Sequence, residues 1–105
     1  MERKMYKYVR CKDGFSVSVQ GNKTGYCNPR NNVGPYTEVE LGFPNMCEPL
    51  IMPWAEDRSA PTNTVYAYVP SEIVLELILK HGGMIDGEIP PMVVIYSINF
   101  PNEDR

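Results

Sequence analysis

The residue types best suited to bind a metal in this chain are its three cysteines and its one histidine: Cys11, Cys27, Cys47 and His81. A Cys₃His set can hold zinc in a tetrahedral structural site. However, no two of these cysteines stand close together in the sequence, as they do in most such sites. We therefore expect the cysteines to pack in the core, and we expect no metal and no cofactor.

Catalysis would need a cysteine–histidine pair or a pair of carboxylates. His81 precedes two glycines at a predicted helix end, where the helix dipole favours a positive charge, so a capping role explains it. Glu38 with Glu40, and Asp86 with Glu88, share a side of an extended chain, but solvated strand and turn residues show the same spacing. We therefore predict no catalytic residue. A small enzyme such as a hydrolase or nuclease is the third functional hypothesis, after the two binding functions described below.

The elements that would position these residues follow from side-chain periodicity. Apolar and polar residues alternate in four segments, and Asp13-Gly14 between the first two predicts a hairpin turn. A helical pattern follows, with Pro70 at its start and Gly82-Gly83 at its end. The predicted strands are residues 5–11, 15–20, 36–41, 64–69 and 92–98, and the predicted helix is residues 70–81. The order β-β-β-β-α-β predicts an α+β fold, a mostly antiparallel sheet with one helix packed on one face.

The length of 105 residues suits a single domain, residues 1–105. Two long irregular loops interrupt it, residues 21–35 and the proline-rich residues 42–63. A turn-rich connection, residues 84–91, follows the helix. The apolar residues of the second loop, including Trp54, are expected to plug the edge of the core, and a binding role is the alternative.

Tyrosines would gather on the sheet face opposite the helix if the valine-rich sides of the strands turn toward it. Tyrosine is rigid and amphipathic, and it is enriched where a surface contacts a partner or stacks on a base. The alternative is that a loop covers this face and buries the rings. The predicted binding residues are Tyr6, Tyr8, Arg10, Lys12, Tyr66, Tyr68 and Trp54.

Charge is distributed unevenly along the chain. Residues 1–30 hold seven Lys or Arg against two acids, a balance of +5, whereas the remainder has a balance of −8. Either the molecule is a dipole whose basic end attracts phosphates, or the two parts neutralise each other across one sheet.

No apolar run approaches the roughly 18 residues that a membrane helix needs, and residues 1–8 lack the apolar core of a signal peptide. An odd number of cysteines suits a reducing compartment. We expect a cytoplasmic protein that has no membrane partner.

The predicted helix is apolar around most of its circumference, which is more than one sheet ordinarily covers. A second copy of the chain, or the loop formed by residues 43–54, must cover the surplus. We expect a homodimer, because two-fold dimers are the commonest oligomers. The residues concerned are Ile73, Val74, Leu75, Leu77, Ile78 and Leu79.

Three segments, YKYVRCKDGFSVSVQ (residues 6–20), GPYTEVELGFP (residues 34–44) and TNTVYAYVP (residues 62–70) with the helix that follows it, resemble small uncharacterised accessory proteins of tailed bacteriophages. The resemblance implies no catalytic residue. It implies a non-enzymatic protein of the host-cell cytoplasm that binds and modulates or inhibits a host protein or nucleic-acid machinery, including a counter-defence role. The alternative is a protein that sequesters a small ligand or nucleotide, with Arg10 and Lys12 on the phosphate and tyrosine rings on the base.

Overall fold

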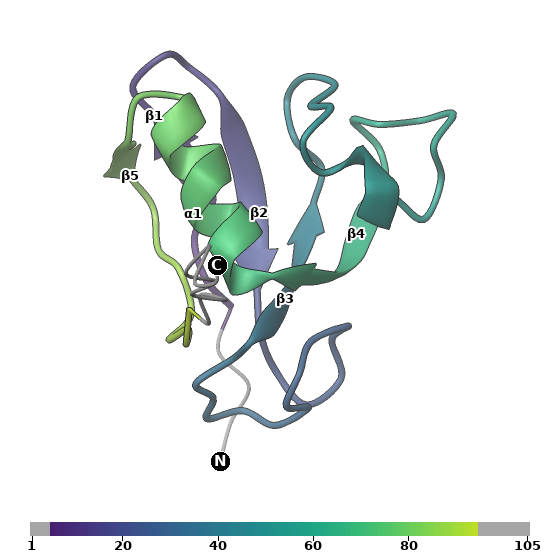
Figure 1. The fold of residues 1–105 in the computed structure, drawn as a ribbon, viewed down its shortest axis with the longest axis vertical. Coiled ribbons are helices and arrows are strands. Elements are labelled where there is room, and N and C mark those ends of the chain that lie inside the picture. Colours follow the sequence, from purple (N-terminus) through teal and green to yellow (C-terminus); the bar gives the residue numbers. More distant parts are fainter. Residues whose placement is uncertain (1–4, 95–105) are drawn as a thin grey trace, which may run out of the picture.

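The structure of the protein is a computed structural model, and it describes residues 5–94. In chain order the elements are β1 (Val9–Cys11), β2 (Ser16–Gln20), β3 (Glu38–Gly42), the 3₁₀ helix η1 (Met52–Trp54), β4 (Val65–Pro70), α1 (Ser71–Lys80) and β5 (Met84–Asp86). The strands form one antiparallel sheet in the order β4-β3-β2-β1-β5. Figure 1 shows α1 in front of the β1–β2 part of this sheet. The predicted α+β class is confirmed.

The first two strands form the predicted hairpin, with Val9 opposite Val17. The Cys11 N–H donates to the Phe15 carbonyl at 2.8 Å, and Gly14 closes the turn at φ 96°. Glycine suits this position because it has no Cβ to clash at positive φ. The first strand begins at Val9, later than the alternation predicted.

The pairing of β3 with β4 contains a β-bulge that the sequence pattern did not reveal. Leu41 lies opposite Tyr66 and Val39 lies opposite Val69, so two residues of β4 face the single residue Glu40. An extra residue in one strand exchanges the faces of all residues beyond it. Tyr66 and Val69 therefore both point into the core, although strict alternation would place them on opposite faces.

Helix α1 begins at Ser71, one residue later than predicted, because Pro70 keeps an extended backbone and ends β4. Its last helical residue is Lys80, one residue before the predicted end, and the predicted glycines Gly82-Gly83 terminate it. The Gly83 N–H donates to the Ile78 carbonyl at 2.9 Å and the Gly82 N–H to the Leu79 carbonyl at 3.1 Å. This is the Schellman arrangement, with a glycine in left-handed conformation after the cap. It makes His81 the C-cap residue.

One hydrophobic core joins the sheet to α1, whose Val74 and Leu77 are fully buried. Ile51, from the long second loop, is also fully buried, and Trp54 packs against the core while half-buried. The expectation that this loop plugs the edge of the core is thus confirmed. The fully or almost fully buried core residues are Val9, Cys11, Phe15, Val17, Val19, Cys27, Tyr36, Val39, Leu41, Ile51, Tyr66, Val69, Val74 and Leu77.

The fifth strand differs from the prediction. Residues 84–86, expected in a turn-rich connection, form β5 and pair with β1. In the expected last strand, residues 92–94 are not in a strand, apart from a parallel bridge between Met92 and Tyr36, and residues 95–98 lie outside the described part of the chain. The new pairing sets Arg10 opposite Asp86, and the Lys7 N–H donates to Glu88 Oε1 at 3.0 Å. Here basic and acidic segments of the chain lie side by side.

Candidate functional site

The predicted tyrosine face does not form one surface. Tyr66 belongs to the core, where its hydroxyl donates to the Pro61 carbonyl, because the bulge in β4 turns its side chain inward. Its proposed binding role on the outer face is therefore wrong. Tyr68, two residues further on, is 39% exposed.

The remaining predicted binding residues lie elsewhere. Tyr8, Arg10 and Lys12 are exposed in or beside β1, whereas Tyr6 is partly buried and its backbone N–H donates to Gln20 Oε1. Two strands separate β1 from β4 in the sheet, which corresponds to about 14 Å between strand axes. Tyr8 and Tyr68 therefore cannot contact one partner group together.

Tyr68 instead forms a cluster with two residues of the first long loop, neither of which is among the predicted binding residues. The rings of Tyr68 and Tyr26 lie 5.9 Å apart at an interplanar angle of 45°. The Arg30 guanidinium carbon lies 5.8 Å from the centroid of the Tyr26 ring, in cation–π contact. We call Tyr26, Arg30 and Tyr68 the aromatic cluster.

Backbone and side-chain hydrogen bonds fix this cluster in place. The Tyr68 N–H donates to the Tyr26 carbonyl at 3.0 Å, and the Tyr26 N–H donates to Glu40 Oε1 at 2.9 Å. Arg30 donates from Nε to the Gly25 carbonyl at 2.9 Å. These hydrogen bonds thus fix the backbone that carries the two rings, and they fix the Arg30 guanidinium directly.

The loop that carries Tyr26 is itself ordered by asparagine side chains. Asn22 Oδ1 accepts hydrogen bonds from both the N–H and the hydroxyl of Thr24, each at 3.0 Å. Asn31 Oδ1 accepts from the N–H groups of Val33 and Gly34. Such asparagine-capped turns replace regular secondary structure as partners for the backbone.

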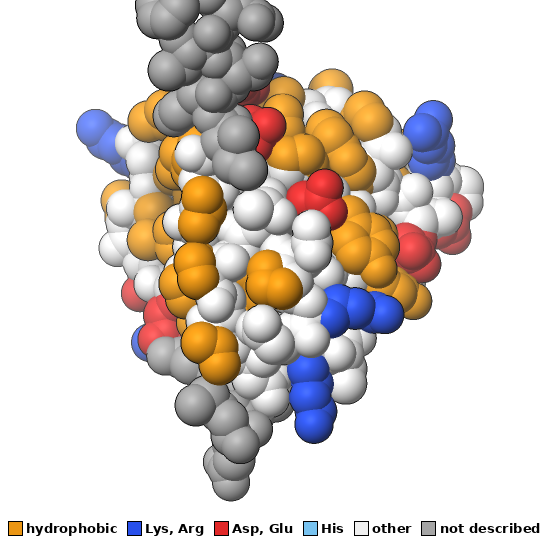
Figure 2. Space-filling model, turned by 60° about the horizontal axis from the view of Figure 1, so that its bottom comes forward, with side chains coloured by type: hydrophobic (Ala, Val, Ile, Leu, Met, Phe, Trp, Pro, Cys, Tyr) orange, Lys and Arg blue, Asp and Glu red, His pale blue; other side chains and the backbone are white. Residues whose placement is uncertain are grey.

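The backbone of Tyr68 has φ 56°, in the left-handed region. A residue with a Cβ pays about 1–2 kcal/mol for this conformation, which glycine adopts freely. Tyr68 nevertheless remains 39% exposed and Tyr26 38% exposed. Figure 2, which brings the lower end of Figure 1 forward, shows hydrophobic, basic and acidic side chains scattered over the face turned toward the viewer.

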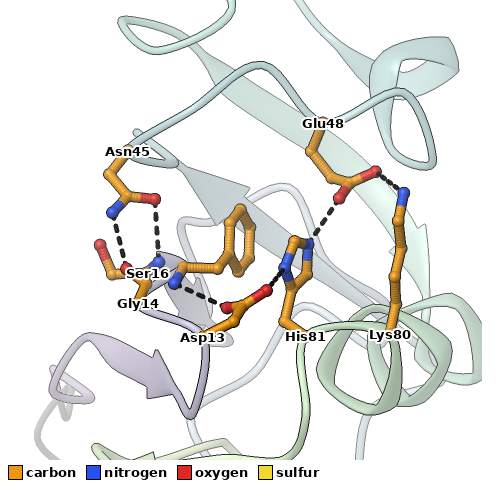
Figure 3. Close-up of polar contacts among 8 residues, drawn as sticks. Asp13, Gly14, Ser16, Asn45, Glu48, Lys80 and His81 are labelled. Carbon is orange, nitrogen blue, oxygen red and sulfur yellow. Dashed lines mark hydrogen bonds and ion pairs between the residues drawn. The ribbon is translucent and has the colours of Figure 1, made fainter.

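A second cluster surrounds His81 at the C-cap of α1 (Figure 3). Its Nδ1 lies 2.7 Å from Asp13 Oδ2 and its Nε2 lies 2.6 Å from Glu48 Oε1. Lys80 Nζ donates to Glu48 Oε2 at 2.8 Å. The imidazole stacks on Phe15, with ring centroids 4.0 Å apart. We call Asp13, His81, Glu48 and Lys80 the histidine clasp.

The charges in the clasp shift each other's pKa values. Burial lowers the pKa of His81, but the hydrogen bonds and charges of Asp13 and Glu48 outweigh it and raise the pKa above its usual value. Burial raises the pKa of Glu48, yet hydrogen bonds from Lys80, the Leu50 N–H and His81 hold it below its usual range. The Phe15 N–H and His81 lower the pKa of Asp13.

The clasp is unsuited to acid–base catalysis or to metal binding. Both ring nitrogens of His81 already face carboxylates, so neither offers a lone pair to a substrate or a cation. Within residues 5–94, no three His, Cys, Asp or Glu side chains are grouped so as to hold a metal ion.

No helix within residues 5–94 is long and apolar enough to cross a membrane.

Comparisons with protein-family models, with curated proteins and with solved structures each returned no match. The two clusters are therefore the structural features that bear on function. The sequence held a signal for part of the clasp, since Asp13 is a predicted turn residue and His81 a predicted helix end. It held none for Glu48, Tyr26 or Arg30, which lie in irregular segments.

Proposed function

We propose that this chain is a non-enzymatic binding protein that recognises a protein partner through the aromatic cluster. The observation that carries the proposal is the tyrosine at position 68, whose ring is displayed at a backbone conformation that favours glycine. Strained conformations of this kind persist where the surrounding structure holds them, here the β-bulge, and they cluster at functional sites.

The composition of the cluster supports a protein partner. Tyrosine and arginine are the residue types most enriched among those that dominate binding energy at protein interfaces. Hydrogen bonds fix the backbone of Tyr26 and Tyr68, and the two rigid rings contact each other, so little conformational entropy is lost when they are covered. Following the resemblance to phage accessory proteins, we propose that the partner is a host protein of the cytoplasm and that binding modulates or inhibits it.

A comparison of four baits tests this function. The wild-type protein, Tyr68→Gly, Tyr26→Ala and Tyr8→Ala would each be immobilised and exposed to host lysate, and the retained proteins quantified by mass spectrometry. Tyr8 is the matched control, because it is an exposed tyrosine outside the cluster. We expect the wild type and Tyr8→Ala to retain the same proteins, and the two cluster variants to lose them.

The retained partner would then be purified and its affinity measured. Hot-spot residues cost at least 2 kcal/mol when truncated, so the Kd should rise about 30-fold or more in Tyr68→Gly. Equal retention by all four baits would overturn the proposal, as would the absence of any specifically retained protein. Thermal melting of each bait separates lost binding from lost folding.

A nucleotide ligand is the second candidate, because Arg30 lies over a tyrosine ring and can hold a phosphate beside a stacked base. In this nucleotide-binding hypothesis, Arg30 contacts the phosphate in place of Arg10 and Lys12, which lie in and beside β1. A thermal-shift screen with nucleotides distinguishes it. Ligand at 100 times its Kd stabilises a protein by about 2.7 kcal/mol, and Arg30→Met should remove that shift.

A further inference from the structure

The protonation state of His81 follows from its neighbours. An ionised carboxylate only accepts hydrogen bonds, so a ring nitrogen facing it must carry a proton. Nδ1 faces Asp13 and Nε2 faces Glu48, both within 2.7 Å. With both carboxylates ionised, His81 is the positively charged imidazolium. The carbonyls at the C-terminal end of α1 add to this preference for a positive charge.

Glu48 depends on that charge because its side chain is only 2% exposed. Its carboxylate accepts from His81 and Lys80 and, at 2.8 Å, from the Leu50 N–H. A buried carboxylate is tolerated only when it is paired and hydrogen-bonded. If His81 becomes neutral, the buried Glu48 carboxylate loses one of its two positive partners. The free energy of Glu48 is then lower when its carboxylate is exposed to water than when it stays buried.

The segment that would move is short and bounded by independent anchors. On one side, Asn45 binds the β1–β2 turn: its N–H donates to the Ser16 carbonyl, its Oδ1 accepts from the Ser16 N–H, and its Nδ2 donates to the Gly14 carbonyl (Figure 3). On the other side, Ile51 is buried in the core. Between them, the Glu48 side chain contacts Lys80 of α1 and the C-cap residue His81, and Leu50 packs against the core while half-buried. We call residues 46–50 the Glu48 loop.

We propose that the proton on His81 locks the Glu48 loop onto the end of α1, and that loss of this proton releases the loop while the rest of the fold stays intact. Release would expose the Glu48 carboxylate and free Met46 and Cys47 from their present positions. The Glu48 loop is thus a local switch whose position depends on pH.

The sign of the pH dependence follows from every charged group around the imidazole. Asp13 faces it from the β1–β2 turn and Glu48 from the loop, while Lys80 on α1 pairs with Glu48. In β1, burial raises the pKa of the Cys11 thiol and the negative charge of Asp13 raises it further. The raised pKa of His81 means that the lock is complete below about pH 6.5 and is lost as pH rises through the pKa of the closed state. The lowered pKa values of Glu48 and Asp13 mean that it is also lost in acid, below about pH 4.

Hydrogen exchange of the Leu50 amide, followed by NMR on the intact chain, tests the proposal. The protein has one histidine, so its imidazole signal gives the pKa directly. The protection factor of Leu50 should fall about tenfold per pH unit between pH 6.5 and the measured pKa and then level off. Amides of the β2–β3 ladder, such as Val19 and Leu41, should keep their protection throughout.

Two variants sharpen the test. Asp13→Asn changes a half-exposed residue and can retain the hydrogen bond from the Phe15 N–H. Asp13→Asn should lower the pKa of His81, so that the protection factor of Leu50 levels off at a lower pH than in the wild type. His81→Gln should leave Leu50 weakly protected at every pH from 6 to 9. The proposal is overturned if Leu50 protection is independent of pH in the wild type, if the ladder amides fall in parallel with it, or if Asp13→Asn leaves its profile unchanged.

Discussion

Tyr68 shows how one residue can be kept against its conformational preference. In an ordinary strand, glycine is less stable than alanine by about 0.5–1 kcal/mol. At φ 56° this order should reverse, because alanine retains the steric strain and glycine does not.

We therefore predict that Tyr68→Gly is more stable than Tyr68→Ala by about 1 kcal/mol. Both variants lose the same ring contact with Tyr26, so their difference isolates the backbone. Urea denaturation of the two proteins measures it. If the alanine variant proves the more stable, the left-handed conformation of Tyr68 is not present in solution.

Glu48 gives a second prediction at the same scale. Glu48→Ala should lower the free energy of unfolding by about 3–5 kcal/mol at pH 6, because it leaves the buried His81 charge with a single, half-exposed partner. Lys80→Met is the comparison variant: Lys80 is 49% exposed and its loss leaves the buried Glu48 carboxylate paired with His81, so it should lower the free energy of unfolding by less than Glu48→Ala does. Equal losses in the two variants would contradict the assignment of His81 as the central charge.

At the scale of elements, the connections of α1 and β5 depend on glycines in left-handed conformation. Gly83 and Gly87 have similar φ angles, 98° and 103°, but different surroundings. A Cβ on Gly83 would meet nothing within 4 Å, whereas one on Gly87 would lie 2.1 Å from the Tyr8 carbonyl oxygen. The close approach arises where the chain after β5 passes the residues just before β1.

We predict that Gly83→Ala lowers the free energy of unfolding by about 1 kcal/mol, because alanine is strained at this positive φ. Gly87→Ala should lower it by about 1–3 kcal/mol more, because its Cβ also clashes with the Tyr8 carbonyl oxygen. Thermal denaturation of both variants provides the comparison. Similar melting temperatures would show that Tyr8 and Gly87 are not in contact.

Local patterns were sufficient to predict the β1–β2 hairpin, the third strand and the end of α1, because turn residues and alternation specify them. The bulge opposite Glu40 was missed because nothing in Tyr66-Ala67-Tyr68 marks the extra residue, and this one omission placed Tyr66 on the wrong face. β5 was missed because three residues are too few to show a period. The histidine clasp joins residues far apart in sequence, which periodicity does not detect.

At the scale of the whole molecule, apolar side chains remain uncovered along one part of the surface. Leu79 on α1 is 75% exposed and Ile85 on β5 is 69% exposed, and the outer edge of β5 pairs with no described strand. The loop formed by residues 43–54 thus leaves Leu79 uncovered, although the sequence analysis offered that loop as an alternative cover. An unpaired edge and exposed aliphatic side chains are both features of surfaces that associate.

We therefore retain the prediction of a homodimer. Sedimentation equilibrium at micromolar concentrations should give about twice the chain mass of 11.9 kDa, and Leu79→Glu with Ile85→Lys should reduce it to the monomer. Asp57→Lys, on an exposed residue far from these two in the sequence, serves as the control. A wild-type mass near 11.9 kDa at all concentrations would rule out the dimer.

The position of β1 between β2 and β5 has a consequence during synthesis. The hairpin partner of β1 is synthesised directly after it, but β5 is complete only about 65 residues after the hairpin ends. At translation rates of about 5–20 residues per second, the outer edge of the nascent hairpin waits roughly 3–13 s for its partner. During that interval neighbouring nascent chains on a polysome can pair with it edge to edge, so the yield of native protein should depend on how fast, and how densely, its messenger is translated.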